Sequence, residues 1–361
     1  MKTNTNNSKS NLYFNYLDIL RGVAALFILI YHYKNLYYKC GGIPYSTEIK
    51  PIYPFYSILK TIYDNGHFSV QLFWLLSGFV FTSVYLQRNT TSFEFFLNRF
   101  SRLYPLHFIS LLTVCLLQII SMYFLNSFQL FDNNDIFHLI LNFFMIYSWG
   151  FETGYSFNGP IWSVSVEIFS YIIFFISLSF LKKYLLKFSV SMVILFLFLN
   201  YNSHFLSDRL SECAYYFYLG VTAFLTLSIL RKHIYTILII SLLTIVISIY
   251  FSYNTSINRF LLSLFFFSLV LFIATLDYLK IAYKIALKLK ILGTLSFSVY
   301  LWHVPLQMFI LIIFDRYSIN RQLFNNPWIL ILFVITTYLI AIISYYFIEN
   351  PLRIFIKKKF I

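Results

Sequence analysis

The chain has 361 residues, of which 60% are hydrophobic and 22% aromatic, while only 11% are charged. A soluble domain cannot bury that much apolar surface, so the composition excludes that class and indicates a polytopic membrane protein. We interpret the formal net charge of +14 as anchoring at an anionic membrane face rather than as nucleic-acid binding. The three cysteines show no CxxC spacing, and we predict no metal site.

Eleven apolar runs follow one another along the chain as candidate helices. They lie at 16–34, 68–86, 104–125, 136–149, 161–181, 188–204, 214–230, 234–252, 258–276, 293–314 and 327–348. The fourth run is short and carries His138 and Asn142, whereas a membrane span needs about 20 residues. The sequence therefore predicts an all-α polytopic membrane protein with about 10 transmembrane helices and one short re-entrant or interfacial helix at 136–149.

Ten spans place both termini on one side of the membrane, and most Lys and Arg residues fall on that side. The positive-inside rule makes it the cytoplasmic side. Charge alone does not distinguish this arrangement from eleven spans with the N-terminus outside, but the shortness of 136–149 favours ten. We predict one integral-membrane domain over 1–361, with a polar tail at 1–15, a long external loop at 34–67 and no appended soluble domain. The first apolar run has no small-residue cleavage pattern and is predicted to be a retained span.

The first span carries three ionisable side chains on one face. Asp18, Arg21 and His32 lie in and beside the run YLDILRGVAALFILIYHY. Arg21 and His32 are about three helical turns apart, so they point to the same side of a helix. Charges inside a membrane span are costly and rare, which makes this stripe a functional hypothesis. The alternative is a buried polar network that only fixes helix packing.

Two later segments add charged residues at the ends of spans. Arg99 and Arg102, in QRNTTSFEFFLNRFSRLYP, share a helix face on which two guanidinium groups can hold phosphate oxygens. The alternative role of such a pair is positive-inside anchoring. Glu167 follows Trp162 by five residues within an apolar run. A carboxylate at that depth needs a partner, and the candidates are Arg21 and His32 of the first span. The alternative is that Glu167 only forms a structural salt bridge.

The C-terminal third holds a cluster of aromatic and ionisable residues. Tyr300, Trp302 and His303 lie close together in LGTLSFSVYLWHVP. A single histidine in such a run is either a hydrogen-bonded packing residue or part of a site. Glu349 and Arg353, in FIENPLR, predict an ion pair at the end of the last span.

Six sequence blocks occur in the order found in one family of membrane enzymes. They are LDILRGVAAL…YH at 17–32, SVQLFWLLSGFVFT at 69–82, NRFSRLYPLH at 98–107, PIWSVSVEIFSY at 160–171, LGTLSFSVYLWHVPL at 292–306 and IENPLR at 348–353. On these blocks the chain resembles the membrane-bound acyltransferase-3 family, whose members O-acylate surface polysaccharides and other acceptors. The segment 185–290 resembles the family only as generic spans. Ile19 and Ser69 stand where the family often has glycine.

The resemblance implies an acyl-CoA-dependent O-acyltransferase that moves an acetyl group from acetyl-CoA to a hydroxyl of a glycan or lipid-linked saccharide. His32 corresponds to the family's essential first-helix histidine. Arg99 and Arg102 correspond to its Arg-x-x-Arg motif, expected to engage the phosphates of CoA from the cytoplasmic side, and Arg21 matches a further functional arginine. The expected location is a bacterial cytoplasmic membrane, with membrane lipids, acetyl-CoA and the glycan as partners and no nucleic acid.

The residues permit two roles for His32. It acts as general base on the acceptor hydroxyl, or it carries the acyl group transiently. Glu167 or Asp18 then orients and charge-stabilises the imidazole, as the third group of a triad does. The residues predicted to bind substrate are Tyr300, His303 and Trp162. The competing hypothesis is a transporter or flippase for a lipid-linked glycan, since intramembrane charges and a basic cytoplasmic face suit that function as well.

Overall fold

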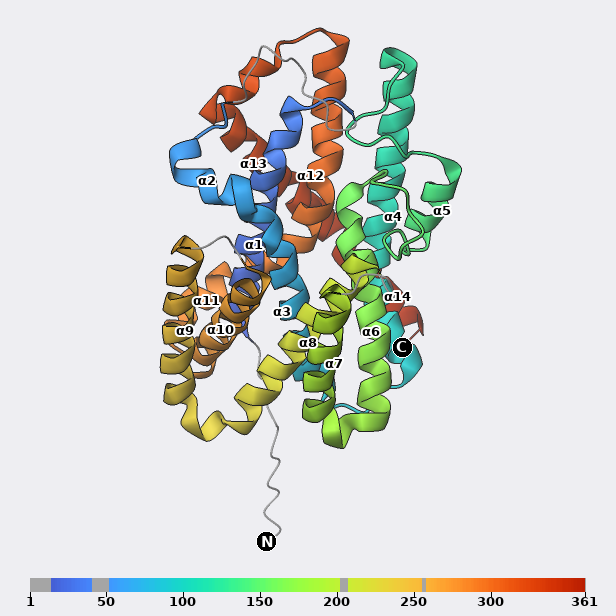
Figure 1. Ribbon diagram of the computed structural model, residues 1–361. Coiled ribbons are helices and arrows are strands. Elements are labelled where there is room, and N and C mark those ends of the chain that lie inside the picture. The colour runs from blue at the N-terminus through green and yellow to red at the C-terminus, as the bar shows by residue number, and fades with distance from the viewer. Residues whose placement is uncertain (1–13, 41–51, 202–206, 255–257, 361) are drawn as a thin grey trace.

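The computed structural model describes residues 14–40, 52–201, 207–254 and 258–360. Every regular element in these ranges is a helix, which confirms the predicted all-α class (Figure 1). The long helices are α1 (Asn15–Tyr33), α3 (Ser69–Tyr85), α4 (Ser92–Leu125), α6 (Trp162–Leu181), α7 (Leu185–Tyr201), α8 (Asp208–Ile229), α9 (Ile234–Asn254), α10 (Arg259–Tyr278), α12 (Ile291–Arg316) and α13 (Pro327–Ser344). Most of the polar tail predicted at 1–15 lies outside the described residues.

Nine segments of the described residues are long and apolar enough to cross a membrane. One of them, Gly159–Asn200, has 42 residues and contains both α6 and α7, joined by the turn Lys182–Tyr184. A single straight helix of that length would measure about 63 Å, roughly twice the thickness of the hydrocarbon core. With α6 and α7 taken separately, the segments agree with the prediction of about ten membrane helices.

The fourth apolar run forms a helix that is too short to span. α5 (Ile136–Phe143) has 8 residues, which is about 12 Å of helix against a hydrocarbon core of about 30 Å. Asp135 caps it, because its carboxylate accepts a hydrogen bond of 2.8 Å from the backbone N–H of His138. That bond and a second from the His138 side chain lower the pKa of the Asp135 carboxyl. The prediction of a short element within 136–149 is confirmed.

Several helical segments were missed by the hydropathy pattern because they are short or amphipathic. They are α2 (Tyr56–Asn65), α11 (Tyr283–Leu289) and α14 (Asn350–Phe360). α2 lies within the segment 34–67, which had been predicted as a loop. α4 also begins well before residue 104, at a capping box in which Thr91 and Glu94 each accept a hydrogen bond from the other's backbone N–H. A Thr-x-x-Glu sequence is the recognised signal for such a start.

α1 runs through the centre of the molecule, with α12 and α3 packed against it (Figure 1). α8 packs on α3, α6 and α7, while α9 pairs with α10 at the periphery. α9 exposes large apolar side chains, among them Ile239, Leu243 and Ile247. Exposed apolar surface of that kind is expected where a helix faces lipid. The polar residues of α1 are therefore enclosed by other helices.

The crossing of α1 and α12 depends on two glycines. A Cβ on Gly293 would overlap with the backbone carbonyl of Asp18, and a Cβ on Gly22 would overlap with Leu292. Small residues allow helix backbones to approach closely inside a membrane, where van der Waals packing drives helix association. This crossing sets the register of α1 against α12, on which the site described below depends.

We expect Gly293→Val to force α1 and α12 apart. Overpacking of this kind costs about 1–3 kcal/mol, so the apparent Tm of the purified protein in lipid nanodiscs should fall. Leu112→Val, at an exposed apolar position on α4, is the matched control and should leave Tm unchanged. An unaltered Tm in Gly293→Val would contradict the close crossing.

Candidate active site

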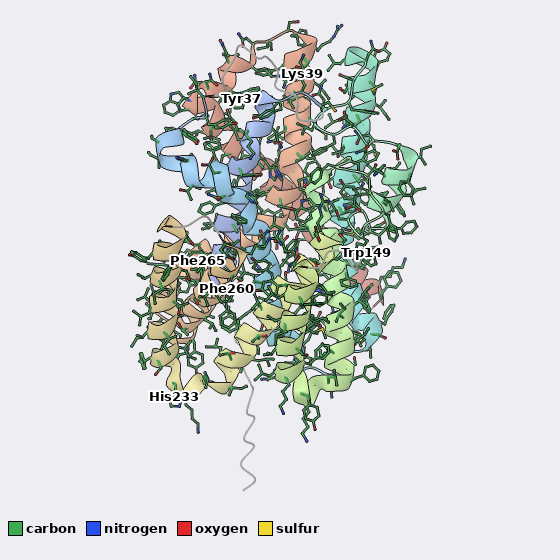
Figure 2. All side chains as sticks on the ribbon, viewed as in Figure 1. Tyr37, Lys39, Trp149, His233, Phe260 and Phe265 are labelled. Atoms are coloured by element: carbon green, nitrogen blue, oxygen red, sulfur yellow. The ribbon has the colours of Figure 1, made fainter. Side chains whose placement is uncertain are left out.

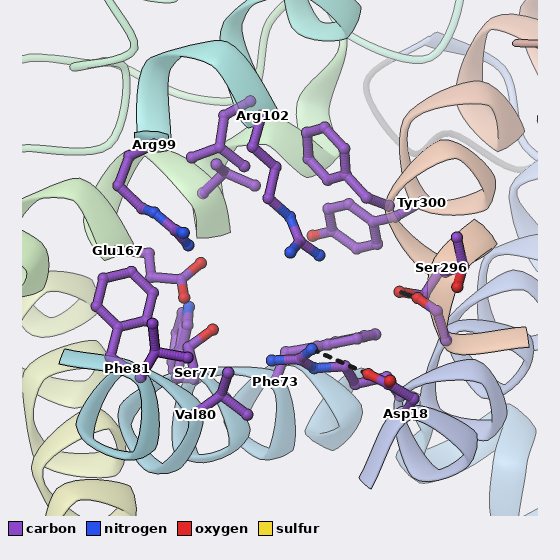
Figure 3. Close-up of a pocket in the computed structure, with 18 of the residues that line it drawn as sticks. Asp18, Phe73, Ser77, Val80, Phe81, Arg99, Arg102, Glu167, Ser296 and Tyr300 are labelled. Atoms are coloured by element: carbon purple, nitrogen blue, oxygen red, sulfur yellow. Dashed lines mark hydrogen bonds and ion pairs between the residues drawn. The ribbon is translucent and has the colours of Figure 1, made fainter. Parts of the chain in front are cut away.

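A cavity of about 460 Å³ lies among α1, α3, α4, α6, α12 and the C-terminal helices. We call it the arginine cavity, because Arg21, Arg99, Arg102 and Arg353 line it. Figure 3 shows the guanidinium groups of Arg99 and Arg102 pointing into it from α4. The prediction that these two arginines share one helix face therefore agrees with the structure.

Arg99 lies against aromatic rings, and it forms no ion pair within 4.0 Å among the residues that the structure describes. Its guanidinium carbon lies 4.6 Å from the ring centroid of Phe81 and 5.9 Å from that of Tyr85. Its Nε is buried and has no hydrogen-bond partner among the described residues. Cation–π contacts position the guanidinium but leave its N–H donors available to an anion.

Arg21 and Asp18 form an ion pair, with 3.3 Å between Nη1 and Oδ1, and both line the arginine cavity. Asp18 is 14 residues before His32 on α1, which is about 21 Å along the helix axis. At that distance Asp18 does not contact the imidazole, so it cannot take the orienting role that was expected of Glu167 or Asp18. The first-helix stripe is divided into a charged part in the cavity and a histidine about three turns away.

Glu167 is 9% exposed and projects into the arginine cavity from α6 (Figure 3). The hydroxyls of Ser77 and Tyr171 and the guanidinium groups of Arg21 and Arg99 surround its carboxylate. Its Oε1 has no hydrogen-bond partner within the described part of the chain. Arg21 of the first span therefore lies near this carboxylate, although its ion pair is with Asp18.

His32 lies against His303. Nδ1 of His32 is 3.2 Å from Nε2 of His303, and the two rings are 4.9 Å apart at an angle of 28°. Nδ1 of His303 points toward the carbonyl oxygens of Val299 and Tyr300, one turn earlier on α12, without forming a hydrogen bond of ordinary geometry. The sequence had singled out both histidines but had not predicted that they meet.

Tyr300 connects the arginine cavity to the histidine pair. Its side chain lines the cavity (Figure 3), and its ring lies 5.9 Å from that of His303. Its hydroxyl donates to the carbonyl oxygen of Pro160 at 2.8 Å and lies 2.7 Å from Oγ of Ser163. α12 therefore carries a continuous row of side chains from the arginine cavity to the histidine pair.

Trp162, which is predicted to bind substrate, packs among aromatic and cationic side chains. Its ring packs edge to face on Trp74 at 5.6 Å, and the guanidinium carbon of Arg209 lies 5.2 Å from its centroid. Trp74, on which Trp162 packs, lines the arginine cavity together with Tyr300, and the substrate-binding role of Trp162 stays a prediction.

Two polar side chains missed by the sequence analysis extend the histidine pair. Gln307 donates from Nε2 to the backbone carbonyl of His32 at 2.7 Å, and Asn35 donates from Nδ2 to Oε1 of Gln307 at 3.5 Å. Gln307 follows His303 by four residues and Asn35 follows His32 by three. Helical spacing, which places such pairs on one face, is the signal that could have found them.

Glu349 and Arg353 do not form the predicted ion pair in the described structure. Glu349 accepts a hydrogen bond of 2.7 Å from Ser298, and Arg353 donates to Oδ1 of Asn350 at 2.9 Å. Both residues line the arginine cavity. Arg353 thus adds a third cation to Arg99 and Arg102 of α4. No spacing in the sequence could have revealed that these three residues line one cavity.

Comparison with protein families matches residues 14–346 to the acyltransferase-3 family, described as an acyltransferase domain. This match includes nearly all of the chain and every site residue above except Glu349, Asn350 and Arg353. The chain belongs to this family. The resemblance found from the six sequence blocks is thereby confirmed, and the matched residues form an acyltransferase domain of this family.

Comparison with curated proteins gives a shorter match. A segment of 67 residues, 18% of this chain, is 40% identical to YrhL of Bacillus subtilis (strain 168), which is named provisionally as a peptidoglycan O-acetyltransferase. The match covers 9% of that relative's length. No solved structure matches the chain.

Among the residues that the structure describes, no group of three or more His, Cys, Asp or Glu side chains is arranged to hold a metal ion. The ionisable residues of the site are instead arranged as ion pairs, cation–π contacts and a histidine pair.

A buried ion pair fixes the chain beyond His32. Nη2 of Arg321 lies 2.6 Å from Oδ1 of Asp315, and its Nη1 donates to the carbonyl oxygens of Tyr38 at 2.6 Å and Leu36 at 3.4 Å. Asp315 also accepts a hydrogen bond of 3.2 Å from Gln129. Arg321 and Asp315 together thus connect the segments that follow α1 and α4 to the end of α12.

We expect Arg321→Met to destabilise the protein by about 3–5 kcal/mol, because it leaves the Asp315 carboxylate without its cation. The apparent Tm in nanodiscs measures this loss. Replacing both partners, in Arg321→Met with Asp315→Leu, should recover part of it. Arg316→Met, at an exposed position on α12, is the control. Equal Tm values for Arg321→Met and wild type would show that the pair contributes nothing.

Proposed function

We propose that this acyltransferase transfers an acetyl group from cytoplasmic acetyl-CoA to a hydroxyl of a cell-surface glycan or lipid-linked saccharide. The observation that supports it best is the line of groups from the paired arginines, through Tyr300, to the histidine pair. In this proposal the protein lies in a bacterial cytoplasmic membrane with both termini on the cytoplasmic side. The arginine cavity is then the donor site.

The charge distribution of the arginine cavity supports a phosphorylated donor. Arg21 is offset by Asp18, whereas Arg99 lies against the rings of Phe81 and Tyr85 and near the Glu167 carboxylate. Arg102 and Arg353 line the same cavity. Arginine binds phosphate oxygens bidentately and is weakly hydrated, so three such groups suit the clustered phosphates of a nucleotide. The extended pantetheine arm would then pass along Tyr300 toward the histidines.

The histidine pair suits acid–base catalysis. If Nδ1 of His303 carries its proton toward the carbonyl oxygens of α12, its Nε2 accepts a hydrogen bond from Nδ1–H of His32. Nε2 of His32 then keeps its lone pair and acts as the base. His303 thereby takes the orienting role that the sequence analysis had given to Glu167 or Asp18.

The proposed reaction has two forms that use the same atom. In the first, Nε2 of His32 removes the proton of the acceptor hydroxyl while the oxygen attacks the thioester carbonyl. The C–S bond breaks, and the imidazolium returns the proton to the departing CoA thiolate. In the second, Nε2 attacks the carbonyl itself, and the C–S bond breaks with departure of the CoA thiolate. The acceptor hydroxyl then attacks the acyl-histidine, the imidazole leaves, and the hydroxyl proton passes to the thiolate.

His32→Ala should abolish acetyl transfer, with a loss of about 10²–10⁴-fold in turnover, since it removes the proposed base. The measurement is thiol release from acetyl-CoA by purified protein in nanodiscs, with a surface-glycan extract as acceptor. His233→Ala, at an exposed histidine remote from the site, should retain wild-type turnover. Wild-type activity in His32→Ala would overturn the assignment.

A second variant separates positioning from folding. His303→Gln keeps a polar side chain beside Nδ1 of His32 and should lower kcat and move its pH profile while the KM for acetyl-CoA stays unchanged. A purely structural role for His303 would instead leave the pH profile in place.

Arg102→Ala should raise the KM for acetyl-CoA by about tenfold or more, because a charge-assisted hydrogen bond contributes roughly 1.5–3 kcal/mol. kcat should change much less. The control is Arg231→Ala, an exposed arginine outside the arginine cavity. A KM that is the same in Arg102→Ala and wild type would argue against a phosphate-binding role.

A further inference from the structure

A second cavity, of about 420 Å³, lies beyond the histidine pair. We call it the aromatic pocket, because Tyr38, Phe131 and Tyr155 line it together with Asn35 and Asn133. Its walls come from the segment after α1 and from the loops on either side of α5. The volume falls within the range of about 300–1,000 Å³ that is typical of small-molecule sites.

The aromatic pocket lies on the opposite side of the histidine pair from the arginine cavity. α1 passes from Arg21 in that cavity to His32, and Asn35 in the pocket follows one turn later. Figure 2 shows Tyr37 and Lys39, which follow α1, at the end of the molecule opposite His233. Asn35 and Gln307 also form a hydrogen-bonded connection to the backbone of His32.

The lining of the aromatic pocket suits an uncharged ring that carries hydroxyl groups. The rings of Phe131 and Tyr155 are 5.7 Å apart at 36°, and they form an aromatic wall. Asn35, Asn133 and Asp132 supply amide and carboxylate groups around it, which can donate to and accept from hydroxyls. Among the lining residues, only Lys39 and Asp132 carry charge, and these are of opposite sign. A polyanionic ligand would require more cations than that.

Hydrogen bonds within the loops that form the aromatic pocket hold these loops in place. Tyr147 donates to the carbonyl oxygen of Gly154 at 2.9 Å and accepts from the backbone N–H of Ser156 at 2.8 Å, on either side of Tyr155. Burial raises the pKa of Tyr147 to about 12, so this hydroxyl stays protonated at neutral pH. Asn134 likewise donates to the carbonyl oxygen of Phe131 at 2.6 Å. The wall is therefore organised before a ligand binds.

We propose that the aromatic pocket binds a sugar ring of the acceptor glycan and presents one of its hydroxyls to His32. The ring stacks on Tyr155 and Phe131, and Asn133 contacts its hydroxyl groups. This inference rests on the function proposed above, and it locates the acceptor on the opposite side of the histidine pair from the donor.

The test uses the full-length protein in cells that lack the chromosomal gene and are complemented with wild type or a variant. Alkali-labile acetate released from the cell-envelope glycan is measured, so that the natural acceptor is present. Tyr155→Leu and Asn133→Ala should lower it at least tenfold, while Tyr155→Phe, which keeps the ring, should retain it. Tyr123→Leu, at an 80% exposed position on α4, is the matched control. CoA binding by each purified variant is measured in parallel.

The outcomes separate this inference from the proposed function. Loss of glycan acetate with unchanged CoA binding supports the acceptor site. Wild-type acetate in both Tyr155→Leu and Asn133→Ala overturns it, as does loss of CoA binding together with acetate, which would indicate misfolding of the loops rather than a lost contact. If wild type itself neither binds CoA nor adds acetate to the glycan, the proposed function fails first.

Discussion

The close crossing of α1 and α12 is the constraint on which the site depends. α1 places Arg21 in the arginine cavity and His32 about three turns further along. α12 places Tyr300 and His303 in parallel positions on its own facing side. Because the backbones meet at Gly293, the two helices have no room to rotate or slide independently. A shift of one residue in either helix would separate the imidazoles.

Burial of charge within the membrane requires compensation, and the structure provides it unevenly. Asp18 offsets Arg21 directly, and Glu349 takes its hydrogen bond from Ser298. Arg99, in contrast, rests on two aromatic rings, which stabilise a cation without occupying its N–H groups. Such an arrangement keeps a positive potential in the cavity, and an anionic donor would complete the compensation. In the proposed function, the affinity for the donor then comes from charge that folding has already buried.

The sequence predicted the helical class, the approximate number of spans and the shared face of Arg99 and Arg102, because all of these follow from hydropathy and helical periodicity. It did not predict that His32 meets His303, since the partner of a helix face is set by tertiary packing. Asp18, one of the two carboxylates expected to orient His32, lies too far from it for a related reason. Periodicity placed Asp18 and His32 on one face, but the axial distance between them exceeds any hydrogen bond.

The positions of the two cavities on either side of the histidine pair suit the different properties of CoA and of the acetyl group. CoA is a large polyanion that cannot cross a membrane, whereas an acetyl group is small and uncharged. A protein that binds the nucleotide on one side and the sugar on the other needs to move only the acyl group past the histidines. In the proposed function, the contacts along Tyr300, His303 and Gln307 lie between the donor site and the acceptor site.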